Sequence, residues 1–131
     1  MDLIAEIKRR LVGYPELSYT ETDNWLEVAA CSPTEFSVGI SIDPGEYTVY
    51  FEGWHQHFDS PDEALDWFAM GLISGTCRLV VIYRGDTPVS FTLEVREEER
   101  WTSHSTTGLI FRPFWRRKRT VCLTNPQRAA A

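Results

Sequence analysis

The segment SPDEALDWFAMGLISG, residues 60–75, carries the clearest secondary-structure signals in the chain. Ser60 can cap a helix N-terminus, Pro61 suits the first helical position, and Glu63 stands three residues after the serine, as in a capping box. Gly75 suits the end of a helix. The segment therefore predicts a helix that begins at Pro61. Apolar residues at helical spacing predict its buried face, namely Leu65, Phe68, Ala69, Leu72 and Ile73.

Two predicted hairpins flank this helix. Before it, residues 36–42 and 46–54 alternate apolar with small or polar side chains around the turn sequence DPGE. Only small residues line the second face of 36–42. After the helix, residues 77–84 and 88–100 are rich in β-branched or alternating apolar residues and are joined by the turn sequence RGDTP. Each pair therefore predicts two adjacent antiparallel strands.

The remaining segments complete the expected fold. Residues 2–12 place apolar side chains on one helical face, residues 24–31 predict a strand, and residues 108–125 predict one or two more. Pro113 indicates an edge strand or a bulge there. The order α-βββ-α-ββ(ββ) predicts an α+β two-layer sandwich, with a mostly antiparallel sheet of about five to seven strands and two helices on one face.

Length and composition indicate a single domain over residues 1–131, with residues 126–131 a frayed tail. With 43% hydrophobic residues the chain can form a packed core. It contains no apolar run of the roughly 18 to 20 residues that a membrane span needs, and its N-terminus lacks the pattern of a signal peptide. We therefore expect a cytoplasmic protein without a membrane partner.

Charge is distributed unevenly along the chain, whose formal net charge is −6. Residues 11–77 contain twelve acidic residues and no lysine or arginine, whereas ten basic residues follow from Arg78 onwards. If the acidic part forms one surface, that surface attracts a basic partner and repels nucleic acid and anionic lipid. The alternative is that a sheet interleaves the two parts and their charges neutralise one another.

The three cysteines, Cys31, Cys77 and Cys122, are widely separated and form no C-x-x-C pair. Each lies in an apolar or β-rich run, so we expect small buried hydrophobic side chains in a reducing compartment. Neither a P-loop nor a G-x-G-x-x-G motif is present in the sequence. We therefore expect no cofactor.

His55, His57 and Asp59 are spaced two residues apart, which in a strand brings two imidazoles and a carboxylate to one face. The H-x-H-x-D run resembles the metal-binding run of metallo-β-lactamase-type hydrolases, although the resemblance covers five residues and Ser60 stands where that family has a further histidine. The alternative is a strand-to-helix connection with solvated polar residues. We favour this alternative because further metal ligands and an enclosing fold are missing.

A basic cluster lies near the C-terminus. The run Arg116, Arg117, Lys118 and Arg119 follows aromatic residues, which is a pattern of single-strand nucleic-acid binding. A pI of about 5.0 argues against nucleic acid as the partner, as does the possibility that these cations pair with acidic residues on neighbouring strands.

Aromatic residues are numerous, with five tryptophans, five tyrosines and seven phenylalanines. This is more than a small two-layer core needs, so some should form an exposed binding surface. Tyr50 and Trp54 are expected on the face of their strand opposite the core, and Trp67 is expected beside the apolar stripe of the helix. Together with acidic residues of that helix they form the predicted binding surface: Tyr50, Trp54, Trp67, Asp62, Glu63 and Asp66.

These observations favour a non-enzymatic module that binds another protein, with a basic partner favoured, or that associates with itself as a homodimer. The alternative is a small-molecule-binding or metal-dependent enzyme that uses His55, His57 and Asp59. A flat aromatic patch would favour the binding module, whereas a concave site around the histidines would favour the enzyme.

Overall fold

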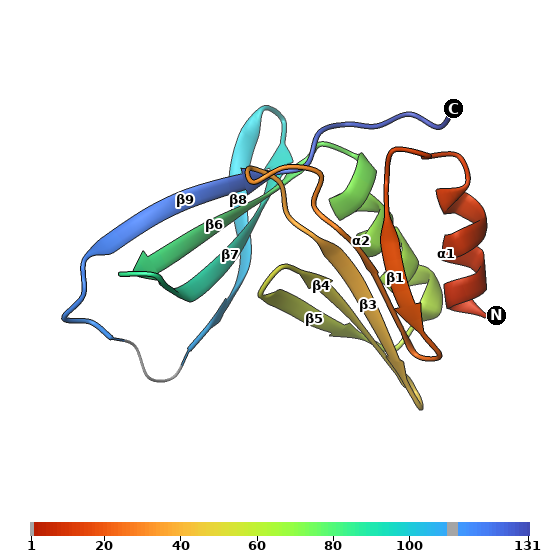
Figure 1. Ribbon diagram of the computed structural model, residues 1–131, viewed down its shortest axis with the longest axis horizontal. Helices are drawn as coiled ribbons and strands as arrows, with labels where there is room; N and C mark the ends of the chain where they lie inside the picture. Colours follow the sequence, from red (N-terminus) through yellow and green to blue (C-terminus); the bar gives the residue numbers. More distant parts are fainter. Residues whose placement is uncertain (1, 110–112) are drawn as a thin grey trace.

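The computed structural model describes residues 2–109 and 113–131, and its described part contains two helices and two antiparallel sheets (Figure 1). The α+β class is confirmed, and the order of helices and strands agrees in outline with the prediction. The elements are α1 (Leu3–Leu11), β1 (Tyr19–Thr22), β2 (Trp25–Val28), β3 (Val38–Asp43), β4 (Glu46–Phe51), β5 (Trp54–Phe58), α2 (Pro61–Ile73), β6 (Cys77–Arg84), β7 (Thr87–Glu97), β8 (Arg100–Gly108) and β9 (Lys118–Thr124).

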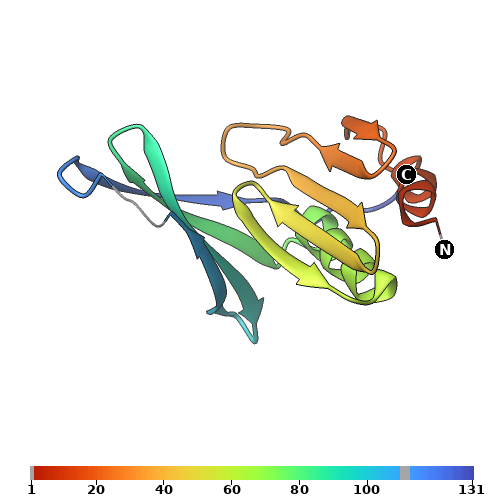
Figure 2. The ribbon, with the colours of Figure 1, turned by 90° about the horizontal axis from the view of Figure 1, so that it is seen from below.

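The strands divide into two sheets where one was expected. The first runs β1-β2-β3-β4-β5 and the second runs β8-β7-β6-β9. Helix α2 packs against β3, β4 and β5, and α1 packs against α2. Figure 2 shows the four-stranded sheet beside the five-stranded sheet, on the side away from α1. In sequence the division falls at α2, since β1–β5 precede this helix and β6–β9 follow it. Each sheet also contains a hairpin turn that the sequence did not reveal, between β4 and β5 in the first and between β7 and β8 in the second.

Glutamates with positive φ form these two turns. Glu52 has φ 53° in the turn between β4 and β5, so residues 46–54, expected as one strand, are parts of two. Glu98 and Glu99 have φ 50° and 67° in the turn between β7 and β8. Such conformations favour asparagine and glycine, so a glutamate in the sequence does not predict a hairpin turn. The same difficulty hid β5, which includes the segment expected as a connection to α2.

The predictions for α2 are largely confirmed. The helix begins at Pro61, and the Ser60 side chain accepts a hydrogen bond from the backbone N–H of Glu63. Leu65, Phe68 and Leu72 are buried as predicted, whereas Ala69 and Ile73 are half-buried. Ala64 and Gly71 complete the buried face. In α1 the apolar side chains expected on one helical face are buried, namely Leu3, Ile4, Ile7 and Leu11.

Close packing joins the two sheets at the loop between β4 and β5. Gly53 faces the ring of Phe91, and an ideal Cβ at this glycine would lie 2.2 Å from that ring. Next to it, the Trp54 indole N–H donates to Ser105 Oγ at 2.8 Å. One cluster of buried apolar residues extends from α1 through both sheets. The base of the four-stranded sheet thus shares the core of the five-stranded one.

The C-terminal segment returns to the body of the protein after β9. Asn125 is buried and bonds to the backbone of Phe36 and Gly71. Beyond it, the backbone N–H groups of Arg128 and Ala131 donate to the carbonyls of Ile73 and Gly13. The segment 126–131, expected to fray, therefore makes backbone hydrogen bonds near the ends of both helices.

The cysteine prediction is correct for one residue and wrong for two. Cys77 is buried at the start of β6, and burial raises the pKa of its thiol to about 11. Cys31 and Cys122 are exposed, because Cys31 lies in an irregular loop and Cys122 lies on the edge strand β9. Among the described helices, none is long and apolar enough to cross a membrane.

Substitution of Phe68 tests the packing of α2. The side chain is 3% exposed, so Phe68→Ala should lower the free energy of unfolding by about 3 to 5 kcal/mol. Asp66→Ala, two residues away on the exposed side of the helix, should change it by less than about 0.5 kcal/mol. Urea denaturation measures both values. Equal destabilisation by the two substitutions would show that the helix is turned the other way.

Thiol titration tests the burial of the cysteines. In the native protein at pH 8, a disulfide reagent should react rapidly with Cys31 and Cys122, because both side chains are exposed to it. Cys77 should react only in denaturant, since its thiol is buried and its pKa is about 11. The variants Cys31→Ser and Cys122→Ser should each remove one fast equivalent. Three fast equivalents in the native protein would contradict the structure.

Candidate functional site

The five-stranded sheet has one face covered by α2 and one face without a described helix over it, which we call the open face. The covered face carries the buried apolar residues of β2, β3 and β4, including Leu26, Ile40 and Val49. Alternation along the strands directs Trp25, Tyr50 and His57 to the open face. Figure 2 shows this arrangement from below, with α2 behind the strands of the β4–β5 hairpin.

Four rings follow one another across the open face, and we call them the aromatic row: Trp25, Tyr50, His55 and His57. The ring centroids are 5.1 Å apart for Trp25 and Tyr50, 5.7 Å for Tyr50 and His55, and 5.6 Å for His55 and His57. The two histidines are exposed, and the other two rings are half-buried. The row therefore presents a continuous aromatic strip from β2 to β5.

A small residue beneath the row makes its geometry possible. Gly39 pairs with Tyr50 in the neighbouring strand, and an ideal Cβ at this glycine would lie 2.9 Å from the Trp25 ring. The ring therefore occupies the space that a side chain at position 39 would fill. The small residues seen on the second face of residues 36–42 thus allow Trp25 to lie against the sheet.

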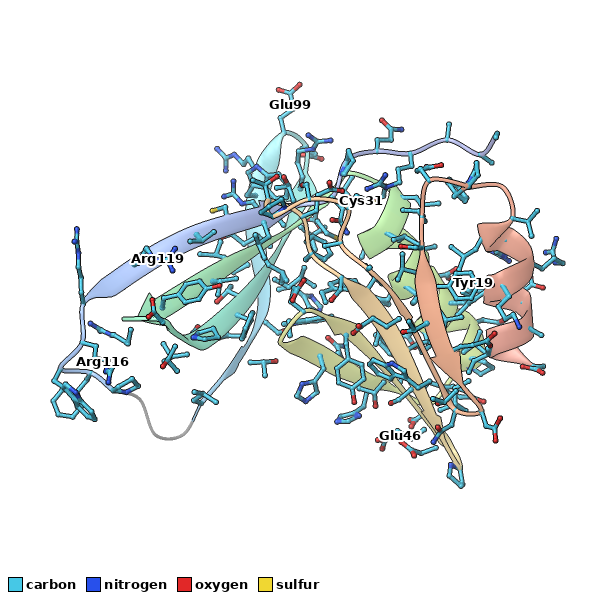
Figure 3. All side chains as sticks on the ribbon, in the orientation of Figure 1. Tyr19, Cys31, Glu46, Glu99, Arg116 and Arg119 are labelled. Atoms are coloured by element: carbon cyan, nitrogen blue, oxygen red, sulfur yellow. The ribbon has the colours of Figure 1, made fainter. Side chains whose placement is uncertain are left out.

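Acidic side chains accompany the aromatic row. By alternation, Glu27, Asp43 and Glu46 belong to the open face, and all three lie within the segment that lacks lysine and arginine. His57 Nδ1 lies 2.9 Å from Glu46 Oε1 and 2.7 Å from Thr48 Oγ1. Figure 3 labels Glu46 on the underside of the five-stranded sheet. The open face therefore combines aromatic area with negative charge.

The predicted binding surface does not form as one patch. Tyr50 lies on the open face, but Trp54 is 0% exposed and was wrongly expected on the surface. The turn at Glu52 places Trp54 in a new strand, where it pairs with Phe51 and points into the core. Trp67 is half-buried on α2, which packs on the opposite side of the sheet.

The acidic residues of α2 are exposed as expected. Asp62, Glu63 and Asp66 lie on the solvent side of the helix, across the sheet from Tyr50. They therefore form a second acidic surface, separate from the aromatic row. The two surfaces are related only by belonging to the same acidic half of the chain.

The spacing of His55 and His57 is confirmed to place both rings on one face, because both residues belong to β5. Asp59 follows the strand and is exposed. Among residues 2–109 and 113–131, no group of three histidine, cysteine or acidic side chains could hold a metal ion. The two histidines instead contact Tyr50 and Glu46 on an exposed face.

A recess lies between α2 and the β7–β8 hairpin. It has a volume of about 250 Å³ and is lined by Trp67, Met70, Val95, Glu97, Thr102, Ser103 and His104. His104 is the extra residue of a β-bulge, since Leu93 pairs with Ser105 and Glu94 with Ser103. The bulge directs its ring toward Trp67, 4.7 Å away between centroids, and its Nε2 lies 2.9 Å from Gln56 Oε1. These contacts connect the two sheets.

The far end of the four-stranded sheet is basic and aromatic, and we call it the basic tip. It comprises Arg84 and the run Phe114, Trp115, Arg116, Arg117, Lys118 and Arg119. Phe114 is 75% and Trp115 72% exposed. The Gly85 N–H donates to the Arg117 carbonyl, which fastens this run to the β6–β7 turn. Phe111, part of the aromatic pattern in the sequence, lies outside the described residues.

Comparison with protein families, curated proteins and solved structures gives no significant match.

Sequence reasoning missed Trp25 and His104. Trp25 was assigned to a strand, but its neighbours depend on the pairing of β2 with β3 and on the room above Gly39. His104 is placed by a bulge in a strand that the sequence did not reveal. The one available signal for Trp25 was the run of small residues in 36–42, which indicates space for a large neighbouring side chain.

Metal analysis tests the histidine pair. We expect protein incubated with zinc or iron and then dialysed to retain much less than one equivalent, because two imidazoles without a third described ligand bind weakly. Elemental analysis of wild type and His55→Ala measures this. One retained equivalent that is lost in His55→Ala would contradict the expectation and make the metal-dependent enzyme the better hypothesis.

Proposed function

We propose that this protein is a non-enzymatic protein-binding module whose binding surface is the open face of the five-stranded sheet. The observation that carries the proposal is the aromatic row, in which each of four rings lies next to its neighbour on a sheet face without a described helix over it. Aromatic residues are enriched in the energetically important parts of protein interfaces. This function needs no catalytic group.

The charge of the open face indicates the chemistry of the partner. Glu27, Asp43 and Glu46 accompany the rings, and the strands around them contain no lysine or arginine. A partner segment with cationic and apolar side chains would place its charges against the carboxylates and its apolar groups against the rings. Arginine suits both contacts, because a guanidinium pairs with carboxylates and stacks on aromatic faces.

The exposure of the histidines favours binding over catalysis. Both imidazoles stand on an exposed sheet face, where water has access to them. Catalytic groups are more effective in a site that excludes water and holds a substrate in place. The arrangement therefore supports protein binding better than the alternative of an enzyme that uses His55, His57 and Asp59.

Peptide binding tests the proposed function. A labelled peptide of alternating arginine and tryptophan should bind, and its fluorescence anisotropy should rise and saturate. The double variant Tyr50→Ala with His55→Ala should weaken binding about tenfold or more, because it removes the centre of the row. Replacing arginine in the peptide with glutamate should abolish binding, and replacing tryptophan with alanine should weaken it.

Asp66→Ala is the matched control, because Asp66 is an exposed acidic residue on the other side of the sheet. This variant should bind the arginine–tryptophan peptide as wild type does. Loss of binding in Asp66→Ala alone would move the surface to α2. Equal binding by wild type and the Tyr50→Ala with His55→Ala variant would refute the open face as the site.

A further inference from the structure

The basic tip holds cations without acidic partners in the described part of the chain. No ion pair joins Arg84, Arg116, Arg117, Lys118 or Arg119 to a carboxylate of the described residues. The described contact of Arg119 is a cation–π contact with Tyr83, at 4.3 Å from the ring. Asp86, in the adjacent turn, lines a recess together with Arg117, Lys118 and Arg119. The tip is therefore a positive end on a chain of net charge −6.

Protection of a sheet edge explains only part of the tip. β9 is an edge strand, and lysine or arginine at an edge prevents pairing with other strands. This role does not account for Phe114 and Trp115, which precede the strand and project into solvent. Exposed rings beside cations are features of a contact surface rather than of edge protection.

We propose that the basic tip of one copy of this chain docks on the open face of a second copy. The proposal rests on the proposed function and names the partner of the same surface. The open face requires cations and apolar side chains from its partner, and the basic tip presents both within one run of the sequence. The match is therefore one of charge and of aromatic area.

Within the described part of the chain, the basic tip and the open face lie apart and do not contact each other. Figure 3 labels Arg116 and Arg119 at the end of the four-stranded sheet remote from the helices, and Glu46 on the underside of the other sheet. The packing of Phe91 on Gly53 and the Trp54–Ser105 hydrogen bond hold the two sheets in this arrangement. The tip can therefore reach an open face only on another molecule.

The contact joins two different surfaces. It is either reciprocal, with two copies exchanging tips in a closed dimer, or head-to-tail, with growth into longer assemblies. A single loop on a sheet face is smaller than a standard interface of about 1,600 Å². Its charged groups are also exposed, so association should weaken as salt screens them.

Sedimentation velocity over a concentration series tests the proposal. At low ionic strength the mean mass should rise with concentration, and in about 1 M salt, where the Debye length is about 3 Å, it should return to that of the monomer. The tip variant Trp115→Ala with Arg116→Glu and Arg117→Glu should stay monomeric. The face variant Tyr50→Ala with Glu27→Lys and Glu46→Lys should also stay monomeric.

Mixing the two variants gives the decisive measurement. Each supplies the surface that the other lacks, so an equimolar mixture should form a one-to-one complex, which also shows that both are folded. Arg100→Glu is the control for a change of surface charge, since it reverses one arginine at the start of β8, outside the basic tip; it should associate like wild type.

A monomeric wild type at every concentration would overturn the proposal, as would association that survives the tip substitutions. A monomer whose tip binds a labelled single-stranded oligonucleotide would assign the tip to nucleic acid instead and would also overturn it. If wild type is monomeric but its open face still binds the arginine–tryptophan peptide, self-docking fails while the proposed protein-binding function stands.

Discussion

The side chain of Asn125 joins three distant parts of the chain, and the relation between the two sheets depends on it. Its Oδ1 accepts from the Phe36 N–H at 3.0 Å, and its Nδ2 donates to the carbonyls of Phe36 and Gly71 at 3.0 and 3.1 Å. The residue follows β9 directly, so it attaches the four-stranded sheet to the entry of β3 and to α2. Because the amide is buried, every one of these groups would lose its partner in a dry environment if the contact were broken.

Two glycines complete the joint that Asn125 begins. Gly71 admits the Phe51 ring against α2, where an ideal Cβ would lie 2.2 Å from that ring, and Gly53 admits Phe91 in the same way. Phe51 in turn stacks on Trp54, with 4.9 Å between ring centroids. Large aromatic side chains thus fill the space between helix and sheets. This explains much of the aromatic content that the sequence analysis assigned to an exposed surface.

Local signals determined which elements were predictable. The N-cap at Ser60 and the turn sequence DPGE are each encoded by a few adjacent residues, and both predictions are confirmed. The hairpin turns at Glu52 and at Glu98–Glu99 were missed, because glutamates there adopt positive φ, a conformation that favours glycine and asparagine. Without these turns, β5 and β8 could not be separated from the strands that precede them.

The candidate site was predictable to a similar degree. Period-two alternation placed His55 and His57 on one face, and it placed Tyr50 opposite the core. Trp25 joins them only through the pairing of three strands, which depends on register and not on local sequence. Trp54 shows the opposite error, since one unrecognised turn residue moved its side chain from the expected surface into the core.

The topology also explains why charge asymmetry along the sequence becomes asymmetry in space. In the five-stranded sheet each strand pairs with its neighbour in sequence, so residues of the acidic segment stay together. Cations reach that half from outside it, where Lys8 of α1 pairs with Glu21 at 2.8 Å and Arg128 of the C-terminal segment pairs with Glu35. By alternation Glu21 lies on the covered face of β1, and Glu35 lies before the start of β3. Neither ion pair therefore neutralises the carboxylates beside the aromatic row. Among residues 2–109 and 113–131, the lysine and arginine ion pairs thus lie away from the open face and leave it negative, which favours a cationic partner from another molecule.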